Sequence, residues 1–89
     1  MRAVIAVIGK DMVGILAKVT TKCAELGINV VQVDQSIMQD LFAMIMMVEF
    51  DKATVDFRNF SDSMEAIGDE MGLKIYVMHE DLFNSMHRI

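Results

Sequence analysis

The residues best suited to chemistry lie in one turn, Gly9-Lys10-Asp11-Met12-Val13-Gly14, directly before a helical pattern that begins at Ile15. A helix N-terminus presents free backbone N–H groups and a partial positive charge, so it attracts a carboxylate or a phosphate. The two glycines let a small ligand approach the backbone closely. Asp11 can take up a cationic group, and Asn29 can donate and accept hydrogen bonds. Together these groups could hold both ends of an amino acid, although a helix cap at Asp11 and a turn at Asn29 explain the same pattern.

Other reactive side chains form less specific patterns. His79, Glu80, Asp81 and His87 do not match a known zinc spacing, and solvent-facing histidines are the simpler interpretation. Cys23 falls in phase with the apolar positions of its helix, where a buried thiol is inert. The ten methionines could bind soft metals or peptides, but Met is also a flexible core residue. The sequence therefore predicts no catalytic residue, no metal site and no cofactor.

Length and composition limit the class of protein. The 89 residues fit one domain, and 54% of them are hydrophobic, above the roughly 45–50% of an ordinary soluble chain. The 13 acidic and 8 basic residues argue against direct binding to nucleic acid. No apolar run approaches the ~20 residues that span a membrane, and the lone Cys23 has no partner for an internal disulfide. We expect a cytoplasmic protein that associates with a partner subunit.

Two strand–helix–strand units follow one another along the chain. Short apolar runs rich in β-branched residues predict strands, and apolar residues three or four apart predict helices. Gly27 and Gly72 stand where the two helices should end. The expected strands are Arg2–Ile8, Ile28–Gln39, Leu41–Phe50 and Leu73–Met78; the expected helices carry the stripes Leu16, Val19, Cys23, Leu26 and Phe57, Phe60, Met64, Ile67, Met71, the second preceded by an N-cap within Asp51–Thr54.

This order predicts an α+β fold, a ferredoxin-like βαββαβ sandwich with a four-stranded antiparallel sheet and two helices on one face. The first and third strands, apolar on both faces, should be central, and the second and fourth should be edges. One apolar face of the third strand would then lack helix cover, which usually marks an interaction surface. A short helical tail at residues 79–89 could cover part of it, and a second copy in a homodimer or higher homo-oligomer could cover the rest.

Several segments together resemble the signature of ACT domains, small amino-acid-sensing modules with this doubled fold. The segments are Gly9-Lys10-Asp11-Met12-Val13-Gly14-Ile15-Leu16-Ala17, then Leu26-Gly27-Ile28-Asn29-Val30, and Gln35. The Met-rich strand Phe42–Val48 and the closing segment Leu82–Ile89 resemble those of stand-alone bacterial and archaeal ACT proteins. The chain is also similar to the sensing half of glycine-cleavage regulators.

The resemblance implies a regulatory module that is not an enzyme and that signals to a protein partner. In this family, paired domains join their sheets side by side, and an amino acid binds at the interface against the first turn. Asp11 and Asn29 would supply side-chain contacts, and the backbone of the turn would hold the carboxylate. An interaction or assembly module without a small ligand is the alternative, and a metal-dependent enzyme is a distant third. The expected ligand-binding residues are Gly9, Asp11, Met12, Val13, Gly14, Ile15 and Asn29.

Overall fold

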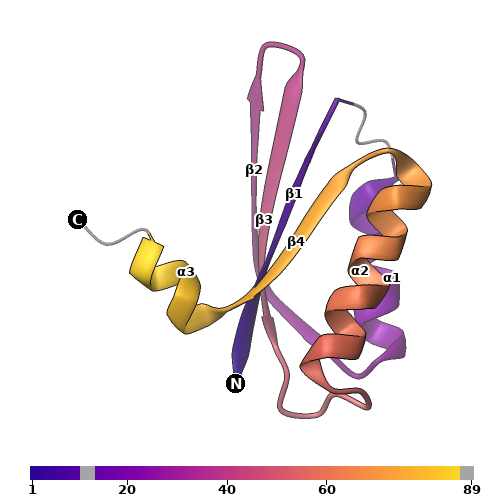
Figure 1. Ribbon diagram of the computed structural model, residues 1–89, viewed down its shortest axis with the longest axis vertical. Coiled ribbons are helices and arrows are strands. Elements are labelled where there is room, and N and C mark those ends of the chain that lie inside the picture. Colours follow the sequence, from indigo (N-terminus) through magenta and orange to yellow (C-terminus); the bar gives the residue numbers. More distant parts are fainter. Residues whose placement is uncertain (11–13, 87–89) are drawn as a thin grey trace.

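The computed structural model describes residues 1–10 and 14–86, within which two strand–helix–strand units are followed by a short helix (Figure 1). The two units repeat the order expected from the hydrophobic pattern. The elements are β1 (Arg2–Gly9), α1 (Ile15–Glu25), β2 (Asn29–Met38), β3 (Leu41–Glu49), α2 (Phe57–Met71), β4 (Lys74–His79) and α3 (Glu80–Met86).

The strands form one antiparallel sheet in the order β2-β3-β1-β4. As predicted, the two strands with apolar residues on both faces are central, and the two strands with polar residues are edges. Helices α1 and α2 lie on one side of the sheet, and α3 lies on the other (Figure 1). The predicted ferredoxin-like α+β fold is confirmed.

The hydrophobic core lies between the sheet and the helices α1 and α2. The ring of Phe60 on α2 is fully buried and lies 5.1 Å from the ring of Phe50, edge to face. Leu16 was expected on the buried face of α1 but is partly exposed, because the buried stripe follows a spacing of four residues from Ile15. The buried cluster comprises Ala3, Ile5, Val7, Ile15, Val19, Cys23, Ile28, Met44, Met46, Val48, Phe60, Met64, Ile67, Leu73 and Ile75.

The ends of the helices follow the sequence signals with one exception. Gly27 follows Leu26, the C-cap residue of α1, and Gly72 directly follows α2; they take left-handed φ values of 73° and 72°, as their positions predicted. The N-cap of α2 is Asp56 and not a residue of Asp51–Thr54. Its carboxylate accepts a hydrogen bond from the backbone N–H of Asn59 at 2.8 Å. Asp56 stands one residue before the helix, the position from which a short acidic side chain reaches the third helical N–H.

The face of the sheet opposite α1 and α2 is covered only at one end. Val4 points to this face and is fully buried, and α3 contacts both β1 and β4 there. Residues farther along the same face, such as Ile8, Ile45 and Tyr76, are exposed. Within residues 1–10 and 14–86, α3 therefore covers part of this face and leaves the rest open. None of the described helices is long and apolar enough to cross a membrane.

Candidate functional site

The junction between β1 and α1 presents a helix N-terminus to solvent. Gly14 is the N-cap residue, is exposed and has φ 79°, and Ile15 behind it is buried. The first helical hydrogen bond runs from the N–H of Lys18 to the carbonyl oxygen of Gly14 at 3.0 Å. The backbone N–H groups of residues 15–17 therefore have no carbonyl partner within the helix. No side chain of the described residues caps this end; Asp11, Met12 and Val13, expected to contact a ligand, lie outside the described residues.

Gly9 ends β1 and has a packing role. A Cβ built on Gly9 would lie 1.9 Å from Cδ2 of Leu73, which is itself buried. The missing side chain of Gly9 thus makes room for Leu73 at the start of β4. Close packing alone accounts for a glycine at this position.

Asn29 lies far from the β1–α1 junction within one protomer. It is the first residue of β2, is exposed, and pairs with Glu49, whereas Gly9 pairs with Phe42. Phe42 and Glu49 are seven residues apart along β3, which corresponds to about 23 Å at ~3.3 Å per residue. Moreover, β3 separates β2 from β1. The structure therefore brings Gly9, Gly14 and Ile15 to one end of the molecule and places Asn29 at the other.

The edge strand β2 is unusually open for a ten-residue strand. Within the described part of the chain it pairs with β3 alone, and a bulge interrupts this pairing at Val31, between Val30 and Gln32. Val31, Ile37 and Met38 are exposed, with Ile37 at 72%. Edge strands of monomeric proteins are usually short or blocked by proline, lysine or another charge. β2 has neither proline nor lysine, its one charged side chain is Asp34, and its bulge lies near its start, so the regularly paired segment from Gln32 to Met38 is suited to pairing with another strand.

A shallow groove of about 660 Å³ separates α1 from α2 on the outer side of the helical layer. It starts at Gly14 and is lined by small residues, among them Ala17, Thr21 and Ala66, together with charged side chains of both helices. Lys18 Nζ lies 3.4 Å from Glu70 Oε1 in this groove, so the charged groups there are already paired. Sequence reasoning missed the groove, although small residues beside both apolar stripes were a visible signal.

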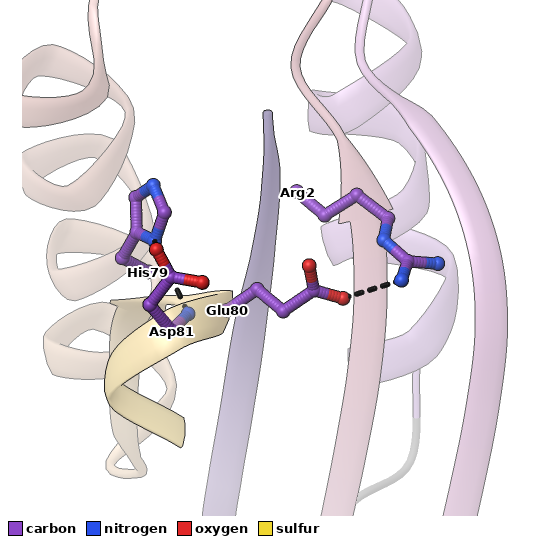
Figure 2. Close-up of polar contacts among 4 residues, drawn as sticks. All are labelled: Arg2, His79, Glu80 and Asp81. Carbon is purple, nitrogen blue, oxygen red and sulfur yellow. Dashed lines mark hydrogen bonds and ion pairs between the residues drawn. The ribbon is translucent and has the colours of Figure 1, made fainter. Parts of the chain in front are cut away.

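The acidic and histidine residues at the end of β4 form polar contacts typical of a helix start, as Figure 2 shows. Arg2 Nη2 lies 2.6 Å from Glu80 Oε2, and the backbone N–H of Asp81 donates to Nδ1 of His79 at 3.2 Å. His79 thereby caps the first turn of α3. Among residues 1–10 and 14–86, no three His, Cys, Asp or Glu side chains gather in a way that could hold a metal ion, and His87 lies outside this part.

Cys23 is fully buried in the core between α1 and the sheet. Burial raises the pKa of its thiol from the usual 9.0 to about 11, because an apolar environment disfavours the thiolate. The nucleophilic form is therefore scarce at neutral pH. A structural role fits this environment.

The fold defines a class of small βαββαβ modules, and comparison with known proteins identifies the family. The model of the ACT domain family matches residues 3–59, so the chain belongs to the ACT domain family. It is 45% identical to the UPF0237 protein of Listeria innocua over 89 residues, all of both chains. The ACT domain protein from Streptococcus pneumoniae has a TM-score of 0.81 and 36% identity over 93% of each chain.

A further similar solved structure is that of a regulatory subunit. It is the regulatory subunit of aspartate kinase from Thermus thermophilus, in its ligand-free form. Its TM-score is 0.63 at 27% identity, over 85% of this chain and 49% of that one. The resemblance to ACT domains seen in the sequence is thus confirmed over most of the chain.

Proposed function

We propose that this protein is a regulatory module that binds an amino acid between two protomers and signals to a protein partner in the cytoplasm. The observation that carries the proposal is that the N-terminus of α1 and the open edge of β2 lie on the same side of the molecule. Helix α1, whose N-terminus has no side-chain cap among the described residues, contacts the open edge strand β2, whereas α2 contacts β4 on the far side. Family membership and the regulatory neighbour support the same function.

A two-fold pairing of β2 strands would bring Asn29 of one protomer to the end of the other protomer that carries the first turn. Two antiparallel strands run in opposite directions, so the start of one β2 lies beside the end of the other. Met38, at the end of β2, pairs with Leu41 and thus lies at the Gly9 end of the sheet. The Asn29 of a second protomer would therefore lie at the β1–α1 end of the first. We refer to this β2–β2 contact as the seam.

The chemistry of the seam suits the two ends of an amino acid. Backbone N–H groups from Met12 to Ile15 would hold the carboxylate, since a helix N-terminus favours a negative charge. Asp11 would bind the ammonium group. Asn29 from the other protomer would donate and accept one hydrogen bond each, as its amide allows. A ligand held in this way contacts both protomers at once.

Such a ligand regulates by stabilising the paired arrangement. A ligand shifts an equilibrium only by its difference in affinity for the two states. An amino acid that needs groups from both sides of the seam binds the pair and not the separate protomers. An assembly module without a small ligand is the second candidate, because the open β2 edge would drive pairing even with no ligand present.

Thermal unfolding with each of the twenty amino acids tests the proposal. A binder present at a hundredfold excess over its Kd stabilises the folded state by about 2.7 kcal/mol. Asn29→Ala should abolish the shift in Tm, and Asn84→Ala, which removes an exposed asparagine on α3, should leave it intact. If no amino acid raises Tm at millimolar concentration, the assembly module without a ligand becomes the better description.

A further inference from the structure

The uncovered part of the sheet carries a contiguous apolar patch on the face opposite α1 and α2. We call Ile8, Leu41, Ala43, Ile45 and Tyr76 the sheet patch. Ile8 and Ala43 are register partners on β1 and β3, and Ala6 joins Ile45 to Tyr76 across β1. The four large side chains expose between 39% and 51% of their surface. A contiguous apolar surface of this kind is uncommon in a protein that stays monomeric.

Polar residues border the sheet patch on both edge strands. Gln32, Asp34 and Ser36 project to this face from β2, since they pair with Met47, Ile45 and Ala43, and Lys74 projects from β4 beside Ile8. Helix α3 stands at the far end, where it covers Val4. An apolar centre with a polar margin and an aromatic residue that carries a hydroxyl group is the usual composition of a protein–protein interface.

The distribution of charge favours a second copy of this chain as the occupant. The chain has a net charge of -5, and α2 is strongly acidic on its outer side. Helix α1 carries Lys18 and Lys22 against Glu25, which does not offset the acidic residues of α2, so the helical layer stays net negative and two copies repel each other through it. At the margin of the sheet patch, in contrast, Asp34 and Lys74 balance each other. Juxtaposing like charges is costly at an interface, so the balanced sheet face is the favoured side for self-contact. The acidic positions of α2 are Asp62, Glu65, Asp69 and Glu70, with Asp56 at its N-cap and Arg58 as its basic residue.

The size of the patch indicates how many copies take part. Together with its polar margin on β2, the uncovered face spans four strands about 4.8 Å apart and some six residues at about 3.3 Å each, which gives a footprint of roughly 400 Å². A standard stable interface uses about 800 Å² of each partner. One patch is therefore too small to hold two single protomers firmly. Two protomers joined at the seam place two patches on one continuous sheet, which doubles the contact to roughly the standard size.

We propose that two seam-joined pairs pack against each other through their sheet patches, giving a four-copy assembly with the helical layers outside. The proposal rests on the seam described under the proposed function. Because the helices face outward, the groove between α1 and α2 stays open for the protein partner. Tyr76 and Ile45 lie at the centre of the contact, and α3 flanks it.

Sedimentation velocity of the full chain at high micromolar concentration tests this contact. The wild type should sediment as four copies, and Ile45→Lys or Tyr76→Lys as two. Ala66→Lys places the same charge on the exposed side of α2 and should remain four copies. Both test residues are on the solvent-facing side of the sheet, and a cooperative thermal transition would show that each variant folds. In Ile45→Lys, any Tm shift caused by an amino acid should persist, since the seam is intact.

The outcomes separate this contact from the ligand proposal. A wild type of two copies that both lysine variants leave unchanged would overturn the sheet-patch contact and point to a different protein as the occupant. A wild type of two copies that Ile45→Lys converts to monomers would overturn the four-copy assembly, because the sheet patch would then join two single protomers without the seam. If the wild type forms four copies, Ile45→Lys reduces the assembly to two and no amino acid raises Tm, the sheet-patch contact is supported and only the ligand proposal fails.

Discussion

Gly9 and Asn29 stand at opposite ends of the sheet, with β3 between their strands. Gly9 pairs with Phe42 and Asn29 pairs with Glu49, so the length of β3 separates them. One protomer cannot bring both residues to the same small molecule. Either Asn29 contacts no ligand, or the ligand lies between protomers. Whether Asn29 belongs to a ligand site therefore depends on how protomers assemble, and assemblies that mix two variants can test it.

Mixing two defective variants should restore binding. Asp11→Ala and Asn29→Ala should each abolish the amino-acid Tm shift when pure, because every site loses one contact. In a mixed pair, one site combines the two substitutions and the other has native Asp11 and native Asn29. Calorimetric titration of the mixed pair, isolated with two different affinity tags, should therefore find one ligand for every two protomers.

A pair of Asn29→Ala and Asn84→Ala protomers serves as the control for this mixture. Each of its sites has native Asp11, and one of the two has native Asn29, so it too should bind one ligand per pair. If the Asp11→Ala and Asn29→Ala mixture binds nothing while this control binds, the two residues act within one protomer, and the seam geometry is wrong.

Gly9 should matter for stability more than for ligand affinity. A Cβ at this position would lie 1.9 Å from Leu73 Cδ2, and overpacking of a core typically costs about 1–3 kcal/mol. We expect Gly9→Ala to lower the free energy of urea unfolding by this amount. Leu73→Val removes the clashing methyl group, so the double variant should be more stable than the sum of the single effects predicts by about 1 kcal/mol. Strict additivity would mean that Leu73 is not the obstacle.

The fold could be predicted from the sequence because its signals are local and consistent. The alternation of Leu73, Lys74, Ile75 and Tyr76 identified an edge strand, and the stripe through Phe60 and Met64 identified α2. The N-cap of α2 was misplaced because several polar residues precede the helix, and only the backbone shows that Asp56 has the extended conformation of a cap.

The candidate site was predictable only in part. The start of α1 at Ile15 follows from Gly14 and the helical period, and both are local. The position of Asn29 relative to the first turn depends on the strand order, which inserts β3 between β1 and β2. The groove between α1 and α2 depends on how far apart two helices pack, and no single segment encodes that distance. Sequence patterns thus predict which element a residue lies on more reliably than they predict how the elements are placed relative to one another.

Cys23 should make stability fall at alkaline pH. The folded-state pKa of about 11 lies above the usual 9.0, so the folded state holds the proton over a range in which the unfolded chain releases it. This contribution is complete below pH 9 and is lost as the pH rises toward 11, by about 1.4 kcal/mol per pKa unit. Urea unfolding of the wild type should weaken over this range more steeply than that of Cys23→Ala. Parallel pH profiles for the two proteins would contradict the burial of the thiol.

The same burial predicts slow thiol labelling. At pH 8 a thiol with a pKa of about 11 is almost entirely protonated, and its side chain is out of reach of reagent. Iodoacetamide should therefore modify native Cys23 only through opening of the structure and should modify the urea-unfolded chain quickly. Rapid labelling of the native protein would place the thiol at the surface.

The ion pair between Arg2 and Glu80 should hold α3 on the sheet only weakly. Its atoms lie 2.6 Å apart, but the side chains remain 45% and 21% exposed, and exposed pairs typically contribute about 0–1 kcal/mol. A double-mutant cycle with Arg2→Ala and Glu80→Ala should therefore give a coupling energy below about 1 kcal/mol that decreases as salt is added.

Asp81→Ala provides the control, since the Asp81 side chain is 88% exposed and has no contact with Arg2 among the described ion pairs. A coupling above about 2 kcal/mol that resists salt would mean that the pair is shielded from water. In that case α3 would be a fixed part of the sheet face, and the sheet patch would have a permanent boundary at Val4.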